Sequence, residues 1–150
     1  MGRIVIQFVE RPDSGNPEEI IKWFCEVFGF ATEGGDSVEE SIFRRFAEVA
    51  HRHEGLTSSE VTVNMTIARS TVIYHLNRFI DSGLLVKKGR KYYLRASEMS
   101  KTIEEIEYDI EREMRRMLDT AREFDKLMDT RTKRLSLSKG VVNARKRGKR

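Results

Sequence analysis

The spacing of apolar residues predicts three elements in the first third of the chain. Residues 3–9 (RIVIQFV) are rich in β-branched side chains, which is typical of a short strand. Between Asn16 and Gly29 the pattern predicts a helix, with the asparagine as its N-cap, a proline at its first position and the glycine after its end. A second amphipathic helix follows, capped by the Asp-Ser pair at 36–37 and ending near Gly55.

The central segment, residues 56–95, contains the pattern of a helix-turn-helix followed by a β-hairpin. Thr57 or Ser58 suits the N-cap of a short helix, and Ser70 suits the N-cap of a longer one. Two strands, at 84–88 and 91–95, are separated by a Gly-Arg pair that suits a two-residue hairpin turn. The longer helix is expected to bury residues that repeat at helical spacing: Val72, Leu76, Phe79 and Ile80.

Residues 98–130 contain no glycine or proline and predict one long helix of about 50 Å. Its apolar residues step by three or four positions, with one inserted step after Ile110, which is typical of a coiled-coil stripe. Pairing with a second copy would cover this stripe, and packing on its own domain is the alternative. The expected dimerisation residues are Ile103, Ile106, Ile110, Met114, Met117, Phe124 and Met128.

These patterns predict a mainly α chain with a small β-hairpin, of the α+β class. Residues 1–35 form an N-terminal strand and an aromatic helix, and residues 36–96 form a winged helix-turn-helix domain. Residues 97–130 form the coiled-coil-like dimerisation helix. Apolar periodicity stops at residue 131, so 131–150 is expected to be a basic, mostly flexible tail.

The distribution of charge separates these segments further. The chain has a net charge of +4, with 6 basic and 11 acidic residues in 1–55 and again in 97–130. Residues 56–96 have 7 basic and 2 acidic residues, and 131–150 have 9 basic residues and no acid. A local excess of positive charge is what binding to phosphates requires, so this distribution indicates nucleic acid as a partner.

The longer central helix has a polar side suited to DNA. Hydroxyl, amide, guanidinium and phenol groups on that side are those that contact base edges and phosphates. The expected DNA-binding residues on this helix are Arg69, Ser70, Thr71, Ile73, Tyr74, Asn77 and Arg78. Those of the hairpin, here called the wing, are Lys87, Lys88, Arg90 and Lys91.

The run STVIYHL at 70–76, followed by DSGLL at 81–85 and a basic, tyrosine-containing hairpin, resembles the ArsR-type winged-helix regulators of bacteria and archaea. MarR- and PadR-like regulators share this pattern. The resemblance covers about 40 residues. It implies that the first half of the long central helix faces the major groove and that the wing contacts the backbone. The cysteine-containing metal motif of the arsenic-sensing members is absent from residues 60–65.

Other classes of function find little support in the sequence. The single cysteine, Cys25, excludes an internal disulfide framework. His51 and His53 lie two positions apart near a helix end, a spacing that does not suit one metal ion. We find no nucleophile–base pair, phosphate loop or metal-ligand spacing, so we expect neither an enzyme nor a cofactor. A small effector bound near Trp23, Phe24 and Phe28 is an open alternative to simple packing of these aromatic side chains.

The sequence therefore predicts a sequence-specific DNA-binding transcriptional regulator that acts as a homodimer on a palindromic promoter site. Two recognition helices about 34 Å apart would contact successive major grooves. The alternative is a winged-helix protein-interaction module within a transcription or RNA-processing complex. With no apolar run long enough for a membrane span and no secretory signal, we expect a cytoplasmic protein. The single glutamine beside abundant Glu and Arg is typical of thermophilic proteins.

Overall fold

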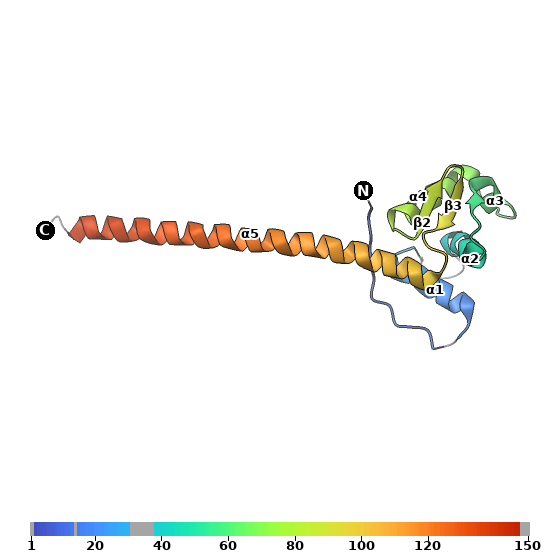
Figure 1. The fold of residues 1–150 in the computed structure, drawn as a ribbon, viewed down its shortest axis with the longest axis horizontal. Helices are drawn as coiled ribbons and strands as arrows, with labels where there is room; N and C mark the ends of the chain where they lie inside the picture. The colour runs from blue at the N-terminus through green and yellow to red at the C-terminus, as the bar shows by residue number, and fades with distance from the viewer. Residues whose placement is uncertain (1, 14, 31–37, 148–150) are drawn as a thin grey trace. The chain divides into compact units, whose positions relative to one another are not determined.

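The structure of the chain, a computed structural model, describes residues 2–13, 15–30 and 38–147, with side chains as far as residue 140. It is mainly helical, with a small antiparallel sheet and a long C-terminal helix (Figure 1). Met1–Ile106 form one compact unit and Glu107–Arg150 form a second. The elements of the first unit are, in order, α1 (Pro17–Val27), α2 (Val38–Ala50), β1 (Leu56–Thr57), α3 (Ser58–Thr62), α4 (Arg69–Asp81), β2 (Leu85–Lys88) and β3 (Lys91–Leu94). The last helix, α5 (Met99–Arg147), begins in the first unit and makes up the second.

Helix α1 begins and ends as the sequence predicts. The side chain of Asn16 accepts a hydrogen bond of 3.0 Å from the backbone N–H of Glu18, and Pro17 occupies the first helical position. Gly29 follows the end of the helix with φ of 77°, a left-handed conformation that glycine adopts without steric cost. The predicted cap of α2 at residues 36–37 lies outside the described residues.

The predicted strand at 3–9 is wrong. The segment is extended but belongs to no sheet, and two of its backbone N–H groups bind the C-terminal ends of helices. Arg3 donates to the carbonyl of Asp81 at 2.8 Å, and Gln7 donates to the carbonyl of Val27 at 2.7 Å. The last carbonyls of a helix have no partner within the helix, so they accept these bonds in place of a strand.

The core of the first unit lies between α2, α4 and the sheet. Its largest fully buried side chains include Phe43 and Phe46 of α2 and Phe79 of α4, with the ring centroids of Phe43 and Phe79 5.8 Å apart. Val72, Leu76 and Phe79 are all fully buried, as the helical spacing predicts. Ile80, the fourth residue predicted for this face, is only half-buried.

The sheet has the strand order β1-β3-β2 and is antiparallel throughout. In the hairpin the register pairs Leu85 with Leu94 and Lys88 with Lys91, which leaves Gly89 and Arg90 as the predicted two-residue turn. Strand β1, whose residues were predicted to begin a helix, pairs Leu56 with Tyr92 and so joins the helices to the hairpin.

Helix α5 extends beyond its predicted end. The predicted helix stops near residue 130 and is followed by a flexible tail, whereas in the structure the helix continues to Arg147. Residues 131–147 contain no proline and a single glycine, at 140, so the local sequence permits the helix to continue.

A candidate nucleic-acid interface

Helix α4 presents one polar face to solvent. At 100° per residue, Ser70, Tyr74 and Asn77 lie on one side of the helix, and all three are exposed. Tyr74 is 61% exposed. Thr71 is exposed and Ile73 half-buried on the flanks of this side. We call these five residues the exposed α4 face.

The N-terminus of α4 lies beside the exposed α4 face. Its N-cap is Ala68, which makes no side-chain capping bond, so the predicted cap at Ser70 is wrong by two positions. An apolar N-cap leaves the first backbone N–H groups available to solvent or to an anion. Arg69 follows the cap, and its Nε donates a 3.0 Å hydrogen bond to the Oγ of Ser58 in α3. This bond ties the guanidinium group to the preceding helix.

Arg78 has partners within the chain. Its Nη1 lies 3.4 Å from Oε1 of Glu39 in α2, and its guanidinium carbon lies 5.2 Å from the centroid of the Phe30 ring. The Nδ1 of His75 lies 3.3 Å from the same carboxylate oxygen. Glu39 is therefore a contact between α2 and α4 that the sequence does not indicate. Of the two arginines predicted to contact DNA, Arg78 is the one whose positive charge is partly neutralised by a carboxylate of the same chain.

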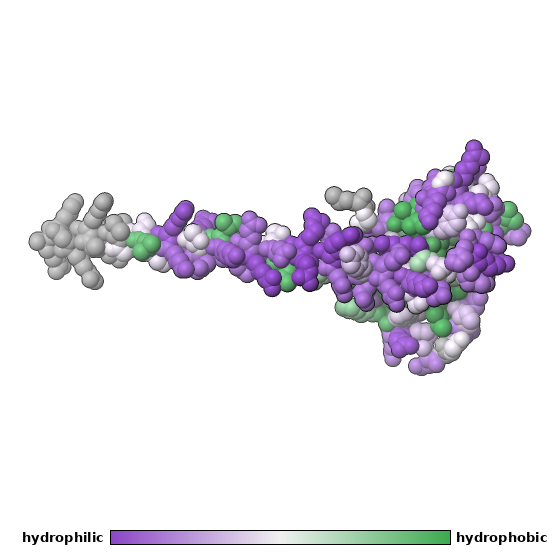
Figure 2. Space-filling view, in the orientation of Figure 1, coloured by the Kyte–Doolittle hydropathy of each residue, from purple (hydrophilic) through white to green (hydrophobic). Residues whose placement is uncertain are grey.

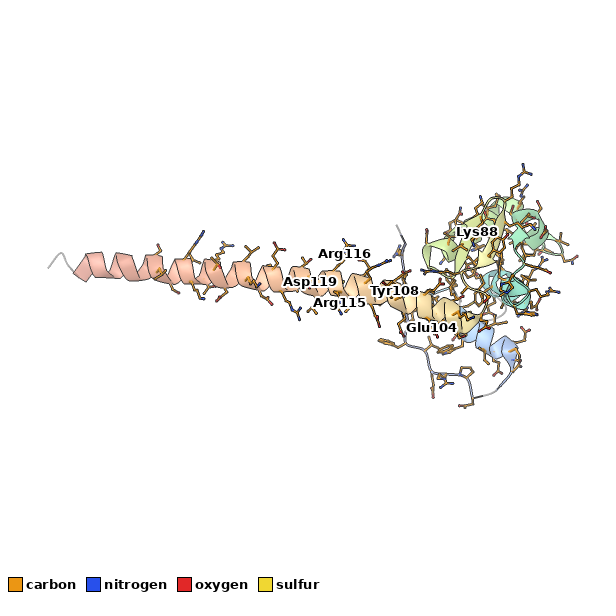
Figure 3. The ribbon with its side chains drawn as sticks, in the orientation of Figure 1. Lys88, Glu104, Tyr108, Arg115, Arg116 and Asp119 are labelled. Atoms are coloured by element: carbon orange, nitrogen blue, oxygen red, sulfur yellow. The ribbon has the colours of Figure 1, made fainter. Side chains whose placement is uncertain are left out.

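The tip of the hairpin is a cluster of exposed cations. Lys87, Lys88, Arg90 and Lys91 are all exposed, and we call these four residues the wing tip. The Nζ atoms of the first two lie over tyrosine rings of β3, 5.3 Å and 5.7 Å from the ring centroids. Gly89 adopts φ of 64° at the turn, as a two-residue hairpin requires. Lys88, the last residue of β2, is labelled in Figure 3.

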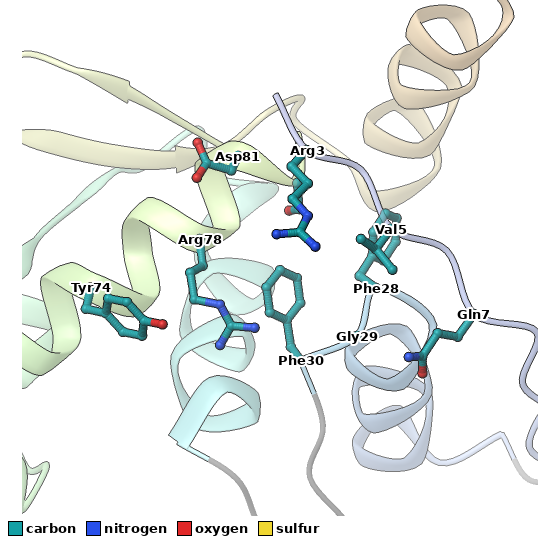
Figure 4. A pocket seen from close by; sticks show the side chains of 10 residues that line it. Arg3, Val5, Gln7, Phe28, Gly29, Phe30, Tyr74, Arg78 and Asp81 are labelled. Atoms are coloured by element: carbon teal, nitrogen blue, oxygen red, sulfur yellow. The ribbon is translucent and has the colours of Figure 1, made fainter. Parts of the chain in front are cut away.

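A cavity of about 410 Å³ lies between the N-terminal segment and the far end of α4. Arg3, Gln7, Phe30 and Arg78 point into or along it, as the close view shows (Figure 4). The guanidinium group of Arg3 makes no hydrogen bond or ion pair with any residue that the structure describes. The sequence does not indicate this cavity, because residues 3–9 have the composition of a strand.

The expected effector region around Trp23 is covered in part by the same N-terminal segment. The indole Nε1 of Trp23 donates to the carbonyl of Val9 at 3.1 Å, and the rings of Trp23 and Phe24 meet edge to face at 5.0 Å. Phe28 is buried. A shallow cavity of about 420 Å³ lies over Trp23 and is lined mainly by residues 6–10. These contacts favour packing over a ligand at this place.

Cys25 is buried, whereas the two histidines near the end of α2 are exposed. Burial raises the pKa of the Cys25 thiol to about 12, and the nearby carboxylates of Glu40 and Glu39 act in the same direction. Among the described residues no group of three or more His, Cys, Asp or Glu side chains could hold a metal ion. His51 and His53 are exposed at the end of α2.

The predicted dimerisation residues differ in their burial. Ile106 is 2% exposed and Ile103 is half-buried, both within the first unit, where Ile106 lies close to Gly83. Ile106 was therefore predicted wrongly as a dimer contact, because the stripe begins by packing on its own domain. Ile110 is half-buried. The rest of the stripe is exposed: Met114, Met117, Phe124 and Met128 are 54%, 59%, 60% and 39% exposed.

No helix in the described part of the chain is long and apolar enough to cross a membrane. Comparison of the chain with known protein families, with curated proteins and with solved structures finds no match.

Proposed function

We propose that this protein is a winged helix-turn-helix regulator that binds DNA sequence-specifically as a homodimer on a palindromic promoter site. The observation that most supports the proposal is the exposed α4 face together with the wing tip. One offers hydrogen-bonding groups and an aromatic ring on a rigid helix, and the other offers four exposed cations.

The order of the elements supports the winged-helix assignment. A first helix, a short strand, two further helices and a hairpin follow one another as α2, β1, α3, α4, β2 and β3. A short segment, residues 63–68, separates α3 from α4, as in a helix-turn-helix. In such a unit the second helix of the pair enters the major groove with its N-terminal residues against base edges.

The chemistry of the exposed α4 face fits this placement. The amide of Asn77 can donate to and accept from one adenine, and the hydroxyls of Ser70 and Thr71 can bind bases or phosphates. The uncapped start of α4 adds backbone N–H groups and the positive end of the helix dipole, both of which favour a phosphate. Tyr74 offers a flat apolar surface with a hydroxyl at its edge.

The homodimer is supported by the exposed stripe of α5. Large apolar side chains that repeat at coiled-coil spacing are rarely left in water, and Figure 2 shows hydrophobic patches interrupting the hydrophilic surface of this helix. A dimer with twofold symmetry would present two copies of the exposed α4 face and so favour an inverted repeat.

Titration of labelled genomic fragments with the full-length protein tests the proposal. We expect Asn77→Ala and Tyr74→Ala to lose most of the preference for the specific fragment over random DNA, by a factor corresponding to about 1–3 kcal/mol for each lost base contact. Glu48→Ala, an exposed change on α2, is the matched control and should bind as the parent does. Equal affinity of the Asn77 and Tyr74 variants and the parent for the specific fragment would exclude the exposed α4 face as the specificity surface.

A further inference from the structure

The exposed stripe of α5 consists of Met114, Met117, Ala121, Phe124, Met128 and Leu135. All six are exposed and step by three, four, three, four and seven positions, which keeps them on one side of a helix wound at 3.5 residues per turn. We call them the α5 stripe. Position 131 falls within the stripe between Met128 and Leu135, and there the residue is Arg131.

The charges that flank the α5 stripe are distributed unevenly along the helix. Residues 105–121 contain six acidic and three basic residues, whereas residues 131–147 contain seven basic residues and no acid. Two of the three basic residues in the first half already pair with acids of the same helix, Arg112 with Asp109 and Arg116 with Glu113. Arg115, Arg116 and Asp119 are labelled on this half in Figure 3. The first half therefore has an excess of negative charge.

The second half has unmatched positive charge. Lys133 pairs with Asp129 at 3.1 Å, but Arg131, Arg134 and Lys139 form no ion pair within the described part of the chain. In a parallel pair of α5 helices these basic halves would lie side by side, and so would the two acidic halves. In an antiparallel pair each acidic half would lie along a basic half.

The residues of the α5 stripe favour the same orientation. In one antiparallel register Phe124 lies opposite Met128 of the second copy, and Met117 lies opposite Leu135. The ring and thioether of the first pair make a favourable contact. The same register places Arg131 opposite the small side chain of Ala121, which leaves room for the guanidinium group. A parallel pair would place the two Arg131 side chains against each other inside the stripe.

We infer that two copies of this chain pair along α5 in antiparallel orientation, with Phe124 and Met128 at the centre of the interface. The interface joins the acidic residues 105–121 of each copy to the basic residues 131–147 of the other. The apolar contacts supply the affinity, and the charges select the orientation.

This orientation has a consequence for DNA that rests on the proposed function. The paired residues 107–147 of one helix span about 60 Å, so in the antiparallel dimer the two chains enter the coiled coil about that far apart. Twofold symmetry is retained, and an inverted repeat is still expected.

Disulfide formation between single-cysteine variants tests the orientation without DNA. Met117→Cys and Leu135→Cys are made in the full-length chain, oxidised singly and as an equilibrated mixture, and the linked species are identified by mass. The native thiol of Cys25 is buried with a raised pKa, and the parent protein under the same oxidant is the control. We expect a disulfide-linked dimer only in the mixture, joining residue 117 to residue 135.

Two outcomes would overturn the inference. Each variant forming a linked dimer by itself would show a parallel pair and overturn the inference. A monomer in sedimentation at high micromolar concentration, with no linked species in any sample, would also overturn it. Neither outcome bears on whether the exposed α4 face binds DNA, because DNA is absent from the experiment.

Discussion

At the scale of single residues, Glu39 has a structural role that its place in the sequence conceals. It is one of two acids in the first turn of α2, where a solvated acid favours the helix dipole. In the structure it is 9% exposed and faces Arg78 and His75 of α4. The position of α4 against α2 therefore depends on a polar contact in a largely apolar interface.

We expect Glu39→Ala to lower the free energy of unfolding by about 1–3 kcal/mol, because Arg78 loses the carboxylate that accepts its hydrogen bond in a partly buried place. Urea denaturation followed by circular dichroism measures the change. Glu48→Ala in the same helix is exposed and should change stability by less than about 0.5 kcal/mol. Similar values for the two variants would show that Glu39 contributes no more than a surface acid.

Cys25 allows a second prediction at this scale. Its thiol is 1% exposed with a pKa raised to about 12 from an ordinary value of 9.0. The pKa of this thiol is higher in the folded chain than in the unfolded chain. The buried neutral thiol therefore makes its full contribution to the stability of the fold below pH 9, and this contribution is lost as the pH rises toward 12. We expect the folded protein to react with a thiol reagent at pH 8 only as fast as it unfolds. A fast, denaturant-independent reaction would contradict this burial.

At the scale of elements, the proposed function gives the wing tip and the exposed α4 face separable roles. The wing tip contains only cations, which bind phosphates of any sequence, whereas the α4 face contains groups that distinguish bases. The contacts of Lys87 and Lys88 with tyrosine rings hold their stems along the strand and leave the charges exposed.

We therefore expect Lys88→Ala to weaken binding to specific and random DNA by the same factor. It should also reduce the slope of log affinity against log salt by about 1, because one phosphate contact is lost. Lys22→Ala removes the same charge from an exposed site on α1 and is the control. Equal salt slopes for the two variants would show that the wing tip does not contact the DNA backbone.

Local elements were predictable where neighbouring residues decide them. The cap at Asn16, the glycine after α1 and the two-residue hairpin turn depend on contacts a few positions apart, and all three are confirmed. Residues 3–9 have strand composition, but a strand needs a partner, and here helix ends accept their hydrogen bonds. The short strand β1 was missed for the converse reason, since only its pairing with β3 makes it a strand.

In the candidate site, the sequence predicts which side chains are exposed but not which residues they contact. The exposure of Ser70, Tyr74 and Asn77 follows from helical periodicity and the buried residues on the opposite side. The internal partners of Arg69 and Arg78 do not, because they lie on α3 and α2, 11 and 39 positions away. Periodicity along α5 likewise could not show that Ile106 packs within the first unit.

At the scale of the whole molecule, the chain combines a compact unit with a helix whose apolar stripe is exposed. The compact unit contains the exposed α4 face and the wing tip, and the helix beyond Ile106 contains the surface that we propose binds a second copy. Dimerisation would double the phosphate contacts and hence the salt dependence of binding.

The most direct test of DNA binding selects fragments from random genomic DNA with the purified full-length protein and sequences those that remain bound at moderate salt. We predict enrichment of an inverted repeat, weakened by added salt and lost with Asn77→Ala while the Glu48→Ala control retains it. Recovery of fragments with no common sequence, or of the same sequences with Asn77→Ala, would contradict the claim that the exposed α4 face recognises DNA.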